Sequence, residues 1–523
     1  LNPDGMDMVV EHYRKSLDTP YEGGSLPGLY HHYVGHDNNR DFVSLNLNES
    51  RAVNRAYSTE WFPQVLIDKH QMGKTGPRYF VPRYHDPIAE NIDGKVWTWT
   101  DVIGSAMARE IGENGLSGVA SNWVFDDYWP GSTTTSNWKN VISLLTEAAS
   151  TRIATPIFVE KAERRVRGKG LSEYKKSVNM PDPWPGGWWR LGDIVAYELA
   201  SWRGAIATAS RLRDDLLTFR NDICREEVER GRTEAPYYYV IPARQHDASE
   251  RDRMVALLAE HGVEIAELGA DATADGRGFA AGDLVVPLAQ PYRPFVKEVL
   301  EVQRYPVRHY TPGGEVIRPY DITSWSLPLH LGVEAVGIDT RSEALEAALR
   351  PYAGEDPAEP SAGDWGIALD PRDNASYRVA YLALAGAEGV TRSSEELAIG
   401  DERMPAGAFL IENPGSELLE AAAAARTLAL DDEPALERRK LADSRIGLVE
   451  TWFHHMDAGW TRFVLESYGI SYTRIRPGEI AEIDLAKSFD VVIFPDADVD
   501  VLMEGKYKQA DEYRVNDYRP EYR

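Results

Sequence analysis

The chain has 523 residues, of which 57 are basic and 83 acidic, so its formal net charge is −26. This length exceeds the roughly 250–300 residues of a single hydrophobic core, and the sequence therefore predicts two to four domains. A surface this negative repels phosphate groups, and no apolar run approaches the roughly 18–20 residues that span a bilayer, so we expect neither nucleic acid nor a membrane span.

Residues 1–160 contain two short apolar runs that each turn polar. Pro63–Ile67 is followed by Asp68-Lys69-His70, and Val141–Leu145 is followed by Thr146-Glu147. Such runs are typical of buried strands in an open α/β sheet, where functional groups collect at the carboxyl ends. We therefore expect an incomplete mixed sheet with flanking helices, and Asp68, His70 and Glu147 at its strand ends.

Residues 161–235 are predicted to form a connector and one long helix. Residues 161–185 are basic and then rich in proline, glycine and tryptophan, as linkers are. Apolar residues then recur at helical spacing from Ile194 to Ile223, which predicts an amphipathic helix ending near Gly231. Cys224 lies in this helix and is expected to be an inert, packed thiol. A single cysteine excludes a disulfide framework and a cysteine-rich zinc module.

Residues 236–440 contain a repeat, which predicts two copies of one small α/β unit. His246–Ser249 corresponds to Asp373–Ser376, and Ala281–Val286 corresponds to Ala406–Ile411. The offsets are 127 residues (373 − 246) and 125 residues (406 − 281), and their agreement favours a duplication.

Residues 441–523 are predicted to begin a further α/β unit. Arg445–Val449 and Phe489–Asp496 are expected strands, and Gly459–Tyr468 is an expected helix between them.

Three groups in the first 160 residues have side chains suited to catalysis. His70, beside the orienting carboxylate of Asp68, is a candidate metal ligand. Glu147, partly desolvated at the end of a strand, is a candidate general base. Asn39 and Arg40 together offer an amide and a planar fork that suit a carboxylate. Taken singly, each is more often an ordinary strand-end or loop residue.

Two other histidine patterns are interpreted as structural. His31, His32 and His36 lie close together, but a tyrosine-rich turn explains them as well as a metal cluster does. His261-Gly262-Val263-Glu264 has the H-x-x-E form, yet it falls where a helix ends and a strand begins.

Taken in chain order, four motifs resemble the zinc carboxypeptidase family, the carboxypeptidase A-like metallopeptidases. Asn2-Pro3-Asp4-Gly5 resembles the family's N-P-D-G turn, and Asp37–Phe42 contains its N-R pair. Asp68-Lys69-His70 resembles the D-x-H segment that carries the last zinc ligand. Tyr128-Trp129-Pro130-Gly131-Ser132, ahead of Glu147, resembles the segment with the family's mobile tyrosine.

The resemblance implies a zinc carboxypeptidase-like catalytic domain over residues 1–160. His70 would bind zinc, Glu147 would be the general base, Tyr128 would close over the substrate, and Asn39 and Arg40 would hold its carboxylate. The implied substrate is a peptide with a free C-terminus, and the implied location is extracellular or periplasmic. The alternative is a non-catalytic relative that binds peptides or other ligands without the metal.

The sequence departs from the family pattern in two ways. The family's first two zinc ligands lie in an H-x-x-E segment ahead of the N-P-D-G turn, and no residue precedes Leu1 here. His70 alone cannot hold a catalytic zinc, so we expect a fragment without activity. The family's second arginine has no clear match, although Arg14 lies near the expected place.

Residues 441–523 resemble the start of a class I glutamine amidotransferase-like domain.

Overall fold

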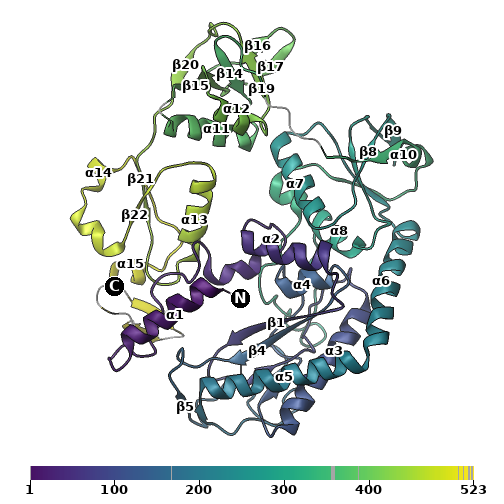
Figure 1. Cartoon of the computed structure of the whole chain (residues 1–523), viewed down its shortest axis with the longest axis vertical. Coiled ribbons are helices and arrows are strands. Elements are labelled where there is room, and N and C mark those ends of the chain that lie inside the picture. The colour runs from purple at the N-terminus through teal and green to yellow at the C-terminus, as the bar shows by residue number, and fades with distance from the viewer. Residues whose placement is uncertain are drawn as a thin grey trace.

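The computed structural model confirms an α/β chain and divides its helices and strands among several small sheets (Figure 1). It describes all residues except 1, 167, 355–359, 387, 505, 510–511, 516–518, 520–521 and 523. No helix in this described part of the chain is both long and apolar enough to cross a membrane.

The first sheet is mixed and has the strand order β1-β4-β2-β3. β1 (Val65–Met72) runs parallel to β4 (Ile142–Ala149). β2 (Tyr79–Phe80) is antiparallel to β4 and parallel to β3 (Val119–Ala120).

Both long strands of this sheet continue past the apolar runs that predicted them. Asp68, His70 and Glu147 therefore lie inside β1 and β4, and their prediction as strand-end residues is wrong. The pairing runs unbroken from Val65↔Ile142 to Met72↔Ala149, so the backbone groups by which the two strands face each other pair whatever side chains they carry. Polar side chains consequently remain on the sheet, where they bond to one another.

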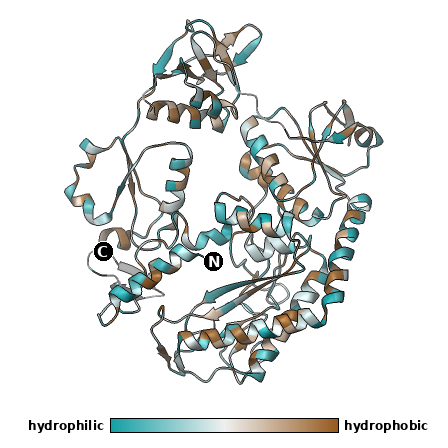
Figure 2. Ribbon diagram, viewed as in Figure 1, coloured by the Kyte–Doolittle hydropathy of each residue, from teal (hydrophilic) through white to brown (hydrophobic). Residues whose placement is uncertain are grey.

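Glycines allow a pair of helices to pack closely on this sheet. α3 (Gly94–Glu113) and α5 (Leu191–Arg211) lie against each other, and a Cβ at Gly204 of α5 would meet the Ala106 carbonyl oxygen at 2.6 Å. Figure 2 shows hydrophobic and hydrophilic patches alternating along these helices. α5 buries Ile194, Tyr197 and Ala200, whereas Leu199, Trp202 and Ile206, three of the apolar residues whose spacing predicted this helix, are exposed.

The single long helix predicted after the connector is two helices. α5 ends at Arg211 and α6 spans Arg213–Thr233, because Leu212 between them has φ −104° and ψ 24°, outside the helical region. Asp214 and Asp215 then occupy the first turn of α6, where negative charge is favourable. The apolar spacing continues across Leu212, so the spacing could not reveal the break between the two helices.

The predicted connector is also part of the first unit. Trp184 and Lys169 are buried, and Lys169 donates to Asp126 Oδ2 at 2.5 Å. The Gly118 amide donates to the Asp182 carbonyl oxygen at 2.7 Å. A Pro-, Gly- and Trp-rich composition thus marks an irregular packed segment here and not a free linker.

The repeat region forms two sheets with matching strand orders. The first copy contains β7 (Tyr238–Ile241), β8 (Ala266–Leu268), β11 (Leu284–Pro287), β12 (Val336–Ile338) and β13 (Leu349–Pro351), in the order β12-β7-β11-β8-β13. The second contains β14 (Gly366–Leu369), β15 (Val390–Ser393), β18 (Phe409–Glu412), β19 (Thr427–Leu430) and β20 (Arg438–Lys440), in the order β19-β14-β18-β15-β20. Taken in chain order, each strand of one copy occupies the same position in the sheet as its counterpart.

The helices and hairpins of the two copies also correspond. α7 (Ala248–Glu260) and α11 (Asn374–Ala385) follow the first strands. The short hairpins β9–β10 (Ala272–Ala274, Arg277–Phe279) and β16–β17 (Leu397–Ile399, Glu402–Met404) precede the central strands. Asp247 and Asp373 precede the two helices and cross-link them, since Asp373 accepts from the Ala248 amide at 3.1 Å and Asp247 accepts from the Asn374 amide at 3.0 Å. The correct alignment pairs these two aspartates, one residue away from the first offset.

The C-terminal unit has a sheet of three parallel strands in the order β22-β21-β23: β21 (Ile446–Val449), β22 (Thr473–Ile475) and β23 (Val491–Ile493). A two-stranded hairpin follows, β24 (Lys506–Gln509) and β25 (Glu512–Val515). The helix α13 (Met456–Ser467) of this unit packs on the N-terminal segment so closely that a Cβ at Gly459 would lie 1.7 Å from the Tyr33 carbonyl oxygen. That segment begins with α1 (Pro3–Ser16), so the motif Asn2–Gly5 is a capped helix start, in which Asn2 Oδ1 accepts from the Gly5 amide.

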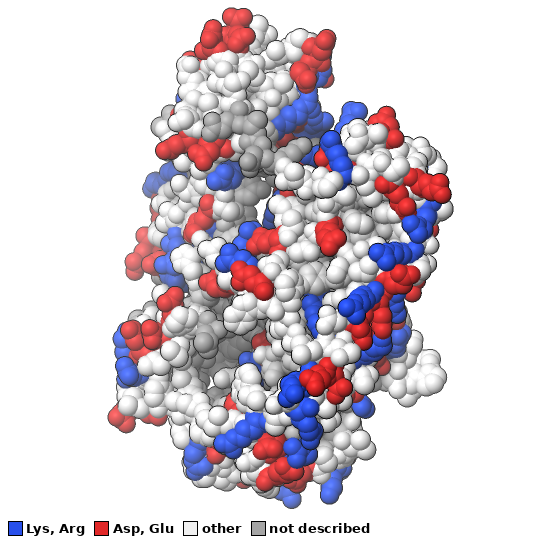
Figure 3. Space-filling model, turned by 45° about the vertical axis from the view of Figure 1, so that its right-hand side comes forward, with Lys and Arg blue, Asp and Glu red and all other residues white. Residues whose placement is uncertain are grey.

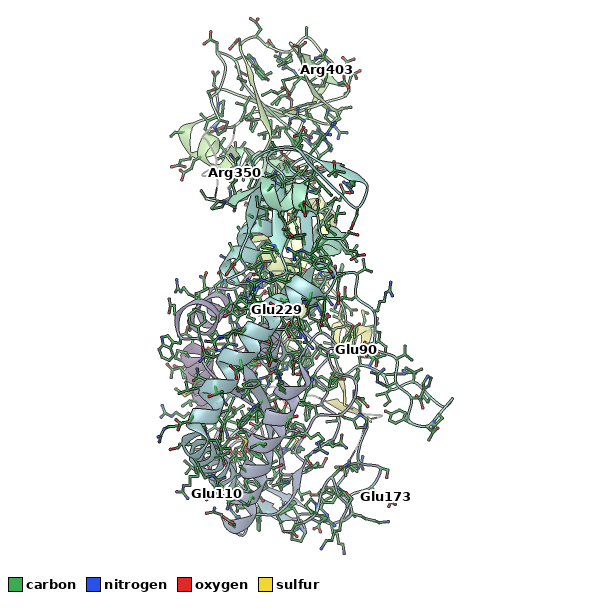
Figure 4. The ribbon with its side chains drawn as sticks, turned by 90° about the vertical axis from the view of Figure 1, so that its right-hand side faces the viewer. Glu90, Glu110, Glu173, Glu229, Arg350 and Arg403 are labelled. Carbon is green, nitrogen blue, oxygen red and sulfur yellow. The ribbon has the colours of Figure 1, made fainter. Side chains whose placement is uncertain are left out.

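The first unit and the two repeat copies follow one another along the long axis of the molecule, and the C-terminal unit lies on the left in Figure 1, beside the N-terminal helix α1. Figure 4 shows the order along the long axis through Arg403 in the second copy, Arg350 in the first, Glu229 on α6 and Glu110 on α3. Acidic and basic side chains are interspersed over the face drawn in Figure 3, so the net charge of −26 is not gathered into one patch there.

A substitution in α3 tests how tightly this helix packs. A Cβ at Gly104 would lie 2.2 Å from the Pro82 carbonyl oxygen, so we expect Gly104→Ala to lower the free energy of unfolding by about 1–3 kcal/mol. Gly112→Ala in the same helix is the control, because its Cβ would meet no atom within 4 Å and should be neutral or stabilising by up to about 1 kcal/mol. Equal effects in urea denaturation would contradict the close approach.

Candidate active site

Strand pairing places the candidate metal ligand beside the candidate base. His70 of β1 and Glu147 of β4 are direct partners in the parallel register. Partners in such a pair project to the same face of a sheet, and residues two apart along a strand do so as well. Asp68 therefore shares this face with His70, and all three groups influence one another's charge.

A hydrogen-bond network holds the imidazole of His70. Its Nε2 lies 3.0 Å from Asp68 Oδ2 and 3.2 Å from the Asn39 amide nitrogen. Ser132, in the first turn of α4 (Ser132–Asn137), donates from its hydroxyl to the same Asp68 oxygen and from its amide to Asn39 Oδ1 at 3.1 Å. Nε2 is thus engaged by the protein, and a metal bound to this imidazole would have to use its other nitrogen, Nδ1.

The charges of Asp68 and His70 support each other. Burial alone would raise the pKa of Asp68 and lower that of His70. Their mutual hydrogen bond and opposite charges outweigh burial, so the pKa of the carboxyl is lowered and the pKa of the imidazole is raised. The pair therefore favours an ionised Asp68 that orients the ring.

Glu147 is the perturbed carboxyl of the site. Its side chain is only 5% exposed, and burial raises its pKa to about 7 despite the opposing charges of His70 and Arg40. Its Oε2 has no hydrogen-bond partner among the residues that the structure describes. A carboxyl with this pKa exchanges its proton near neutral pH, as a general base must.

Asn39 and Arg40 reach the site from a 3-10 helix, η1 (Gly35–Arg40). The Arg40 guanidinium lies over the Trp129 ring, 5.0 Å from its centroid, with one nitrogen 3.3 Å from His36 Nε2. It also donates to Asp321 Oδ2. Asn39 is buried and bonded to His70 and Ser132, so its amide positions the network and is not free for a ligand.

Tyr128 is not brought to this site, which corrects the role expected for it. It is 4% exposed and packs against Trp325 and Tyr305, with ring centroids at 4.8 and 5.6 Å. The tyrosine close to Glu147 is Tyr320. Burial and the negative charge of Glu147 raise the pKa of Tyr320 to about 12. Tyr128 packs in an aromatic cluster because burial of its ring removes a large apolar surface from water.

The remaining histidines behave largely as the sequence predicts. His261 is fully buried, with Nδ1 2.8 Å from Lys139 Nζ and Nε2 2.9 Å from the Val43 carbonyl oxygen, so both ring nitrogens have partners within the protein. Burial lowers the pKa of this imidazole well below its ordinary value. His31 pairs with Glu49 at 3.4 Å. His36 is the exception, since its ring lies 5.9 Å from that of His70.

These residues do not complete a zinc site by themselves. A catalytic zinc takes three protein ligands and leaves one position open. Within the described parts of the chain, no three histidine, cysteine, aspartate or glutamate residues gather in a way that could hold a metal ion. His70 Nδ1 is one donor, and Asp68 serves as its orienting partner.

Sequence reasoning missed three residues of the site. Ser132 stood within the Tyr-Trp-Pro-Gly-Ser motif, and its position at a helix start is a signal for a hydrogen-bonding role. Nothing in the sequence around Tyr320 and Asp321 indicated a role at the site. Asp321 lies 281 residues beyond its partner Arg40. No local pattern records a contact of that separation.

Comparison of the chain with protein-family models, curated proteins and solved structures finds no match. Any proposal about function therefore rests on the chemistry of the site.

Substituting Glu147 tests its burial through the pH dependence of stability. The folded state keeps the proton up to about pH 7, whereas the unfolded chain releases it near 4.5, so this stabilising contribution is present at low pH and lost as pH rises between the two. Glu147→Gln cannot release a proton and should gain about 3 kcal/mol of stability relative to the wild type across this window. Denaturation from pH 5 to 8 measures it, and a constant difference would contradict the prediction.

Proposed function

We propose that this chain belongs to a zinc-dependent metallocarboxypeptidase, which hydrolyses the C-terminal bond of peptides that carry a free carboxylate. The supporting observation is the meeting of three groups at one place: the buried carboxyl of Glu147, the oriented imidazole of His70 and the Arg40 fork. Each of the three has a different task in such a reaction.

In this proposal Arg40 binds the carboxylate of the last residue. Its flat guanidinium is held against Trp129, which fixes the plane of the fork before a ligand arrives. Asn39 keeps the neighbouring network in place through His70 and Ser132.

Glu147 moves the proton. With a pKa of about 7 it is half ionised near neutral pH, so it can accept a proton from an attacking water and return it to the leaving nitrogen. Because its Oε2 has no protein partner in the described residues, no hydrogen bond must be broken first.

Zinc, when bound, would polarise the peptide carbonyl and acidify a water molecule. His70 Nδ1 would be one ligand, and two more are required. The codons ahead of Leu1 provide a direct check: an H-x-x-E segment there supports hydrolysis.

A second candidate function is carboxylate binding without hydrolysis. It is favoured by the incomplete metal set around His70, beside an anion-binding arginine that is in place. An extracellular or periplasmic location is part of the carboxypeptidase proposal only.

Binding of a free acid tests the role of Arg40. Arg40→Gln should weaken binding of acetyl-glycyl-phenylalanine by about 10–100-fold, because a charge-assisted fork is lost, and should leave its C-terminal amide nearly unaffected. Isothermal titration calorimetry measures both. Equal weakening of acid and amide would show that Arg40 does not read the carboxylate.

Activity and metal content test the catalytic roles. In a zinc-loaded, active form of the protein, Glu147→Gln should keep the metal and lower turnover by about 10²–10⁴-fold, while His70→Ala should lose the metal. Mass spectrometry for zinc and hydrolysis of a blocked dipeptide are the measurements. Retention of zinc and rate in His70→Ala would place the site elsewhere.

A further inference from the structure

A carboxylate of the chain itself occupies the Arg40 fork. Asp321 Oδ2 accepts from the Arg40 guanidinium, and the two side chains are 18% and 14% exposed. The other oxygen of Asp321 accepts from the Ile322 amide at 2.7 Å. Arg40 is the only cation paired with Asp321 among the described residues.

The segment that carries Asp321 is fastened on both sides. The Tyr320 amide donates to Asp126 Oδ2 at 2.9 Å, and Lys169, which is ion-paired with Asp126, reaches the Arg318 carbonyl oxygen at 3.3 Å. This anchor holds the backbone just before Asp321.

The second anchor lies a few residues further on. The Trp325 and Ser326 amides donate to Gln303 Oε1 at 2.5 and 3.1 Å, and the Trp325 indole donates to Glu298 at 3.1 Å. Between the anchors Ile322 is 44% exposed. A change in the Asp321 rotamer can therefore free the guanidinium while both anchors stay intact.

We propose that Asp321 is a specificity-determining residue that competes with the ligand for Arg40. This inference rests on the proposed role of Arg40 as the carboxylate-binding group. A ligand carboxylate displaces the Asp321 carboxylate from the fork, and the ligand's negative charge takes its place. A C-terminal amide has no charge with which to replace it, so Asp321 stays and continues to block the fork.

The physical reason is that one guanidinium in a half-buried site cannot bind two carboxylates without bringing like charges together. Desolvation strengthens both the attraction to Arg40 and the repulsion between the acids. Specificity then comes from an element that excludes the wrong ligand as well as from one that attracts the right ligand.

Removing the Asp321 charge tests the proposal. We expect Asp321→Asn to bind acetyl-glycyl-phenylalanine about tenfold more tightly than the wild type, and its amide within about twofold, by calorimetry at low salt. Asp321→Ala should give the same result without an amide side chain. Melting temperatures of both variants establish that they are folded, and if one does not fold the other carries the test.

Asp101→Asn is the matched control. Asp101 forms an Arg–Asp pair with Arg83 at 2.9 Å, remote in sequence from η1, and its removal should leave both affinities unchanged. A similar gain in this variant would show that reduced net charge, and not release of Arg40, strengthens binding, and would overturn the proposal.

The failure of this inference is distinguishable from that of the proposed function. If the Asp321 variants bind the acid no more tightly while Arg40→Gln still loses it, the competition is wrong and the carboxylate role of Arg40 stands. If Arg40→Gln binds the acid as well as the wild type does, both are wrong.

Discussion

The parallel pairing of β1 with β4 is the constraint on which the site depends. An unbroken register from Val65↔Ile142 to Met72↔Ala149 fixes His70 opposite Glu147 and puts Asp68 on the same face. β4 is buried along its whole length, so this register cannot slip by one residue without turning its side chains to the opposite face. The proximity of acid and imidazole is thus a consequence of the core and not of any loop.

The first unit buries several charged groups, and two irregular segments of the chain help to compensate their burial. Lys169 from the supposed connector neutralises Asp126, and Tyr320 donates to that same carboxylate. Asp127 is fully buried beside Asn137, and burial raises its pKa to about 8. Residues 161–185 and 301–326 thus supply a charge and a hydrogen bond to the buried Asp126, and burial also raises the pKa of Glu147.

The two copies of the repeat contribute unequally to the candidate site. Their strand orders match, and Asp247 and Asp373 bind each other's helix starts. Only in the first copy, however, does the chain between β11 and β12 contain a long excursion, residues 301–326, that reaches Arg40. The first copy thus reaches the site through an insertion, and the strands on either side of the insertion belong to the sheet of that copy.

The sequence by itself determined the α/β class, the two strands that carry the site, and the residue types at His70, Glu147, Asn39 and Arg40, because apolar runs and short motifs are local properties. It did not determine how far the strands extend, where the long helix breaks, or that Tyr128 belongs to an aromatic core. Those depend on the pairing and packing partners available to each residue. Tertiary structure alone decided that Asp321 meets Arg40 across 281 residues, since such a contact arises from how whole units close over one another and leaves no trace in neighbouring sequence.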